Sequence, residues 1–208
     1  GGEANAVAPA VVETKPGAFG QSGDVRLQLR LPGELFKFPA ALMGSAELAE
    51  YQWVKAEDST AASPILGFRG SSVSAPGRPG FYRLAVLRAD GRRVLDSVTL
   101  GVLVPFAAKL GSTLNGYRMG RYARERALGE SSSPPRGFVE VFPADAEMSV
   151  STHFRLADFL SHDGQERWPR YLAIDPRILD KVELVLRYLG SRDHDIPMDV
   201  HSGFRTPL

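Results

Sequence analysis

The 208-residue sequence has no cysteine, which excludes disulfide frameworks, thiolate zinc sites and cysteine nucleophiles. No apolar run approaches the roughly 18–20 residues of a membrane-spanning helix, so no transmembrane segment is expected. Net charge is also nearly absent, at +1. Because phosphate binding needs a basic face, nucleic acid is not expected as a partner. Neither a G-x-S-x-G serine motif nor a glycine-rich phosphate loop occurs.

One basic stretch departs from this balance. It interleaves four arginines with two tyrosines: Arg118, Arg121, Arg124 and Arg126 with Tyr117 and Tyr122. We favour a solvated surface strand or loop here, and contact with an anionic polymer is the alternative.

The first half of the sequence has the patterns of an all-β domain. Hydrophobic residues make up 43% of the chain, enough for a packed core. Residues 1–21, rich in Gly, Ala and Pro, are predicted to be a flexible leader, with order beginning at Val25. Period-two alternation predicts the strands, which are residues 25–31, 51–54, 82–87 and 98–104. The Asp90-Gly91 step predicts a hairpin.

Two features favour an immunoglobulin (Ig)-like β-sandwich over residues 22–106. Trp53 occupies the place of a central core tryptophan, and residues 79–82 (PGFY) are typical of a tyrosine corner. We therefore expect Trp53 and Tyr82 to be buried, with the Tyr82 hydroxyl bonded to upstream backbone. Residues 107–148 are predicted to bridge to a second domain and to add a strand or two between 111 and 122.

Residues 149–208 change from alternation to a helical period, which predicts an α+β domain. Leu156, Phe159 and Leu160 indicate a short helix with Ser151 or Thr152 near its cap. A longer helix follows Asp175 as its cap and ends at Gly190. Its predicted buried stripe is Ile178, Leu179, Val182, Val185, Leu186 and Leu189. Residues 198–201 are predicted to form a strand.

Four segments of this second half occur in the order typical of one enzyme family. They are residues 137–141 (GFVEV), residues 151–156 (STHFRL) with Phe159, the helix after Pro176, and residues 202–207 (SGFRTP). With the upstream residues 115–120 (NGYRMG), they resemble the zinc D-alanyl-D-alanine carboxypeptidases, whose last segment is usually SGYRTP. The resemblance covers roughly the last third of the chain.

The resemblance implies a periplasmic, envelope-bound or secreted hydrolase that acts on peptidoglycan stem peptides, as a zinc D,D- or L,D-carboxypeptidase or endopeptidase. It implies that Arg205 lies at the active site, where it polarises a carbonyl or holds an oxyanion. Ser202 and Phe204 would shape the substrate cleft, and Phe204 lacks the hydroxyl of the usual Tyr. His153 either borders this cleft or is a core histidine bonded to backbone.

The family holds its zinc with an S-x-H-x-x-G-x-A-x-D segment and a later His, neither of which occurs in the 208 residues. We therefore expect the peptidase-like domain to be incomplete at its C-terminus, without zinc and inactive as this chain. A local metal site among residues 193–201 (DHDIPMDVH) is the disfavoured alternative to a polar turn. The second hypothesis for function is a non-catalytic envelope binding or scaffolding protein, and the third is an adhesion module.

Overall fold

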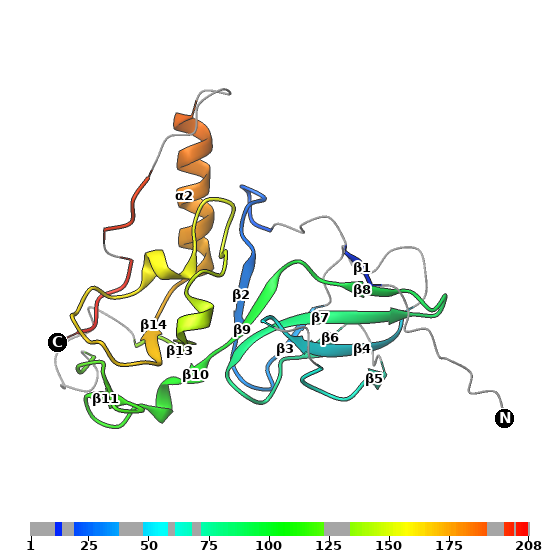
Figure 1. The fold of residues 1–208 in the computed structure, drawn as a ribbon, viewed down its shortest axis with the longest axis horizontal. Helices are drawn as coiled ribbons and strands as arrows, with labels where there is room; N and C mark the ends of the chain where they lie inside the picture. Colours follow the sequence, from blue (N-terminus) through cyan, green and yellow to red (C-terminus); the bar gives the residue numbers. More distant parts are fainter. Residues whose placement is uncertain are drawn as a thin grey trace.

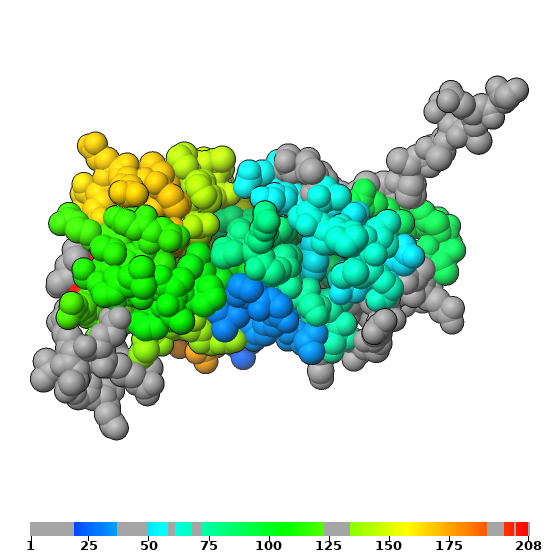
Figure 2. Space-filling model, turned by 90° about the horizontal axis from the view of Figure 1, so that it is seen from below, coloured from blue at the N-terminus to red at the C-terminus, as the bar shows by residue number. Residues whose placement is uncertain are grey.

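The computed structural model describes residues 11–13, 19–37, 48–57, 61–67, 72–122, 134–190, 198–201 and 203–207. These residues form a largely β structure with one α-helix, α2 (Pro176–Leu189). The molecule is elongated (Figures 1 and 2). Figure 1 shows most strands of the first half at one end and α2 with a small sheet at the other. A largely β fold is therefore confirmed.

The main sheet of seven strands is built from the first half of the chain. Its strands are β1 (Val11–Glu13), β2 (Leu27–Arg30), β4 (Leu48–Lys55), β5 (Leu66–Gly67), β7 (Gly80–Arg88), β8 (Arg93–Leu95) and β9 (Thr99–Val102). The central strand β7 pairs antiparallel with β4, β8 and β9, and β4 pairs with β5. Both β1 against β8 and β2 against β9 are parallel.

A second, two-stranded sheet pairs β3 (Leu35–Lys37) with β6 (Ser72–Ser74). It packs on the main sheet, because Val73 of β6 shares a buried core with Trp53 of β4 and Tyr82 of β7. The Phe36 ring of β3 lies 5.9 Å from the Trp53 ring. The burial of Trp53 and Tyr82 is confirmed, and so is the hydroxyl bond, since Tyr82 Oη donates to the Arg78 carbonyl at 3.0 Å.

The predicted hairpin at Asp90-Gly91 is confirmed as the connection between β7 and β8. Gly91 has a φ of 81°, a left-handed conformation that glycine adopts without steric cost. The predicted strand over residues 98–104 is present as β9 and β10 (Val104–Pro105). The chain changes sheets between them, since β10 pairs with β13 of the second half.

The second half holds a three-stranded antiparallel sheet in the order β10–β13–β14, with β13 at Gly137–Val141 and β14 at Arg170–Leu172. The predicted addition between residues 111 and 122 is the hairpin of β11 (Thr113–Leu114) and β12 (Tyr117–Arg118). The described residues of this half also form short 3₁₀ helices, η1 (Phe106–Ala108), η3 (Pro143–Asp145) and η4 (Leu156–Phe159). The predicted short helix is η4, but its cap is Arg155 rather than Ser151 or Thr152.

Helix α2 has the predicted ends and a different buried face. The Asp175 side chain accepts from Arg177 N, and Gly190 follows the last turn. The predicted stripe is wrong for Ile178, Val185 and Leu189, which are exposed, whereas Leu179 and Leu186 are buried. Glu183 is buried between them, because its carboxylate finds partners on another segment. The buried face is thus partly polar.

Two other predictions fail at the ends of the chain. Regular structure begins earlier than Val25, since β1 lies within the predicted leader and pairs with β8. Residues 198–201 form no strand, and Figure 1 draws this red segment without an arrow. Met198 and Val200 pack against the core instead, so burial rather than strand pairing explains their apolar character.

The largest core crosses the predicted domain boundary. Val25, Leu27 and Leu103 of the first half are buried in one cluster with residues of β13, β14 and α2. The strands β2 and β9 lie near the middle of the molecule, where its two ends meet (Figure 1). Among the described residues, no helix has the length and apolar character needed to span a membrane.

Candidate functional site

His153 is held by a buried carboxylate of α2. Glu183, whose side chain is 0% exposed, accepts from the His153 backbone N–H at 2.9 Å and contacts the ring Nδ1 at 2.6 Å. An ionised carboxylate only accepts, so the hydrogen of this contact lies on Nδ1. The His153 side chain is 42% exposed. His153 is therefore not a core histidine with its ring bonded to backbone, because the ring reaches solvent and its Nδ1 partner is the Glu183 carboxylate. Its place at a substrate cleft stays a prediction.

The same face of α2 binds the segment that enters β2. Asp180 accepts from the backbone N–H groups of Gln21 and Ser22 at 3.1 and 2.9 Å and from the Ser22 hydroxyl at 2.6 Å. These hydrogen bonds lower the pKa of Asp180, and the bond from the Ser22 hydroxyl has the largest effect. One turn beyond Glu183, Arg187 pairs with Asp24 at 2.7 Å. The polar stripe of α2 therefore fastens the two halves of the molecule together.

The two main motifs of the resemblance meet at Gly203. A Cβ atom at Gly203 would lie 2.6 Å from Phe159 Cα, so only glycine lets the two backbones come this close. Phe159 is buried with Phe154 and Leu156, and their cluster also receives Phe204. Phe204 contacts the neighbouring cluster around Tyr117 and Tyr171 as well. Segments more than forty residues apart are thus packed into one framework.

Of the remaining predicted site residues, Ser202 lies outside the described residues. Arg205 is exposed and also interacts with another group of the chain. Its segment is held by a backbone bond from Arg121 N to the Pro207 carbonyl at 3.2 Å. Arg205 therefore projects from a loop, since the strand predicted just before it, over residues 198–201, is absent.

A buried tyrosine network beneath this loop has no counterpart in the sequence predictions. Tyr117 donates to Asp163 at 2.7 Å, and Tyr171 donates to Glu140 at 2.6 Å. Burial and these carboxylates raise the pKa values of both phenols, which stay protonated donors. The network anchors the second half. Within the basic stretch, Tyr117 is thus a core residue, and Arg124 and Arg126 lie outside the described residues.

A polar cavity of about 500 Å³ lies between the two halves, beside Asp145, Glu57 and Arg83. Asp145 is buried and accepts from Phe142 N at 2.7 Å. Burial, with the nearby charges of Glu57 and Glu140, raises the pKa of Asp145 to about 6.

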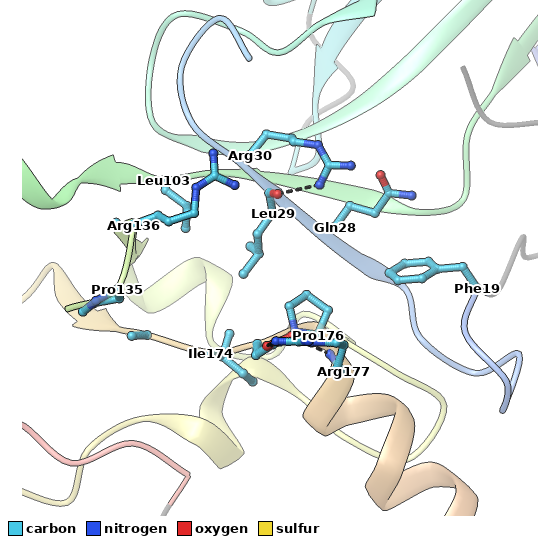
Figure 3. Close-up of a pocket in the computed structure, with 13 residues that line it drawn as sticks. Phe19, Gln28, Leu29, Arg30, Leu103, Pro135, Arg136, Ile174, Pro176 and Arg177 are labelled. Carbon is cyan, nitrogen blue, oxygen red and sulfur yellow. Dashed lines mark hydrogen bonds and ion pairs between the residues drawn. The ribbon is translucent and has the colours of Figure 1, made fainter. Parts of the chain in front are cut away.

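A second cavity, of about 680 Å³, lies between β2 and the turn from β14 into α2 (Figure 3). Phe19, Leu29, Leu103 and Ile174 contribute its apolar walls. The guanidinium groups of Arg30 and Arg136 lie at the wall formed by β2 and the segment before β13. Of the predicted site residues that the structure describes, neither His153, Phe204 nor Arg205 lines either cavity.

The described residues contain no group of three His, Asp or Glu side chains placed to hold a metal ion. Asp193, His194 and Asp195 of the disfavoured metal cluster lie outside the described residues. Glu183 already occupies the Nδ1 of His153.

No family model, no curated protein and no solved structure matches the chain.

Proposed function

We propose that the chain is a cell-envelope protein of the zinc D-alanyl-D-alanine carboxypeptidase type, and that its second half binds peptidoglycan stem peptides. The observation that carries this proposal is the packing of residues 151–159 against residues 203–207. Only glycine fits at position 203, because the backbone there lies against Phe159. Phe204 packs against two neighbouring core clusters. These residues belong to the two segments that resemble the family. Their contact supports the proposal that the two segments form one framework around the peptide.

Arg205 is the residue that we propose to hold the peptide. A guanidinium offers donors in a rigid fork that matches a carboxylate or a carbonyl pair. A stem peptide ending in D-alanyl-D-alanine presents both. We propose that His153, whose Nδ1 is held by Glu183, turns its other ring nitrogen, Nε2, toward the same peptide. A purely structural Arg205, which only fastens its loop, is the competing interpretation.

The zinc that the family uses does not fit the described residues, because they hold no set of three ligands. We therefore derive no hydrolytic step from these residues. The function proposed for this chain is recognition of the peptide, and hydrolysis remains an expectation from the resemblance.

For the first half we propose an Ig-like domain that docks or positions the second. The strand order supports this, since β4, β7 and β9 are neighbours in one sheet while β3 pairs with β6 in the other. The Tyr82 hydroxyl bonded four residues upstream and the buried Trp53 on β4 also agree with such a domain.

The second candidate is a non-catalytic envelope binding or scaffolding protein. The shared core and the Asp180 and Arg187 bonds favour it, because they join the two halves rigidly. Rigid joining suits a protein that presents a surface to a partner.

Calorimetric titration of the full chain with a synthetic stem peptide ending in D-alanyl-D-alanine tests the proposal. We expect saturable binding that Arg205→Lys weakens about tenfold, because a Lys loses the bidentate geometry. Arg92→Lys, on the distant β7–β8 turn, is the control and should bind as the parent does. Absence of binding, or equal affinity for the Arg205 and Arg92 variants, would refute the proposal.

A further inference from the structure

The cavity between β2 and α2 has the size and composition of a small-molecule site. Its volume of about 680 Å³ lies within the roughly 300–1,000 Å³ that such sites occupy. Its two walls come from residues 28–30 and residues 173–177, which only tertiary packing brings together. Figure 3 shows Leu29 and Ile174 pointing toward each other across the space.

Most of the lining is apolar. Phe19, Leu29, Leu103, Ile174 and Pro176 supply most of the surface that a ligand would touch. Among the described residues of the lining, Gln28 is the one neutral polar side chain. A peptide backbone would need a partner for each N–H and C=O group that it brings in. A hydrocarbon or aromatic body has no such requirement, so the lining favours it.

Positive charge exceeds negative charge at the polar side. Arg136 pairs with Glu34 at 2.9 Å, and Arg30 donates to the Leu29 carbonyl at 2.7 Å while lying over the Phe36 ring. The lining also holds Arg177, which Asp175 neutralises. Glu34 thus pairs with Arg136 and is reached by Arg30 only through its charge, so these two guanidinium groups exceed the carboxylate beside them. Each guanidinium has five N–H donors, so donors remain for an added anion.

We propose that this cavity binds a small amphipathic carboxylate. Its apolar body lies between β2 and the β14–α2 turn, and its carboxylate is held by Arg30 and Arg136. The inference does not rest on the wall-peptide proposal, because neither arginine belongs to the segments that resemble the peptidase family.

The test is a titration of the full chain, with labelled methyl groups, against decanoate below its micellar concentration. We expect saturable shifts of the Leu29, Leu103 and Ile174 methyl signals, with one dissociation constant. Arg30→Gln and Arg136→Gln should each weaken binding about tenfold, the loss expected for one charge-assisted hydrogen bond. The control Arg92→Gln should leave it unchanged. Decanol, which carries no charge, should bind the parent and the variants alike.

Three results would overturn the proposal. The first is a set of shifts that do not saturate or that fall outside the cavity. The second is a decanoate affinity that Arg30→Gln and Arg136→Gln leave equal to that of Arg92→Gln. The third is tighter binding at the same methyl groups by acetyl-Leu-Leu-Ala-Ala, which would make a peptide the occupant. Failure of decanoate here leaves the stem-peptide titration at Arg205 unaffected, so the two proposals are tested separately.

Discussion

Gly203→Ala tests the contact on which the proposed framework depends. The added Cβ would lie 2.6 Å from Phe159 Cα and 2.7 Å from Phe159 Cδ1. Rotation of the ring relieves only the second contact, because the first is with backbone. Overpacking of this kind costs about 1–3 kcal/mol. For a chain of this size the melting temperature should fall by about 2–12 °C.

Gly77→Ala is the matched control. Nothing lies within 4 Å of a Cβ built at Gly77, so its effect should stay within about 0.5 kcal/mol. Differential scanning calorimetry of the parent and both variants measures the difference. A difference below about 1 °C corresponds to less than about 0.5 kcal/mol. If the melting temperatures of Gly203→Ala and Gly77→Ala differ by less than this, residues 203–207 do not pack on Phe159 as described.

Three further predictions concern α2 and the cavity beside Asp145. Leu186→Ala should lower the free energy of unfolding by about 2–5 kcal/mol because Leu186 is buried. Leu189→Ala should lower it little, because Leu189 is 58% exposed. Equal losses for the two variants in urea unfolding would contradict the observed helix face. Glu183→Gln should move the His153 hydrogen from Nδ1 to Nε2, because the amide NH₂ replaces an acceptor, and ring ¹⁵N shifts that stay unchanged would contradict the contact. The folded-state pKa of Asp145, about 6, lies above its ordinary 3.8, so the folded state binds more protons between these values. Unfolding free energy should therefore fall as pH rises from about 4 to about 6, and Asp145→Asn should flatten this slope. An equal slope in both proteins would assign it to other groups.

Local signals in the sequence predicted the elements well. Helix α2 is capped by Asp175 and ended by Gly190, both within one turn of the helix itself. The strands around Trp53 and Tyr82 follow from alternation and from the turn residues beside them. These features need no knowledge of distant segments.

Features that depend on distant partners were predicted less well. Glu183 is buried because His153, thirty residues away, supplies two partners, and apolar periodicity contains no sign of this. Residues 198–201 alternate like a strand, yet they pack on the core without pairing. The described residues that line the cavity beside Arg30 come from five separate segments, so no local pattern marks it.

The resemblance drew attention to the segment with Gly203 and Arg205. The structure explains why residue 203 is a glycine, since a Cβ atom there would lie too close to Phe159. For Arg205 it adds exposure on a fixed loop. Its role at a substrate remains a proposal.

The most direct test of the wall-peptide proposal is a map of backbone amide shifts during titration with a stem peptide ending in D-alanyl-D-alanine. We predict that the largest shifts fall on residues 203–207 and around His153. These shifts should disappear with Arg205→Ala, while the rest of the spectrum is retained. Shifts confined to the first half, or no shifts at millimolar peptide, would contradict it.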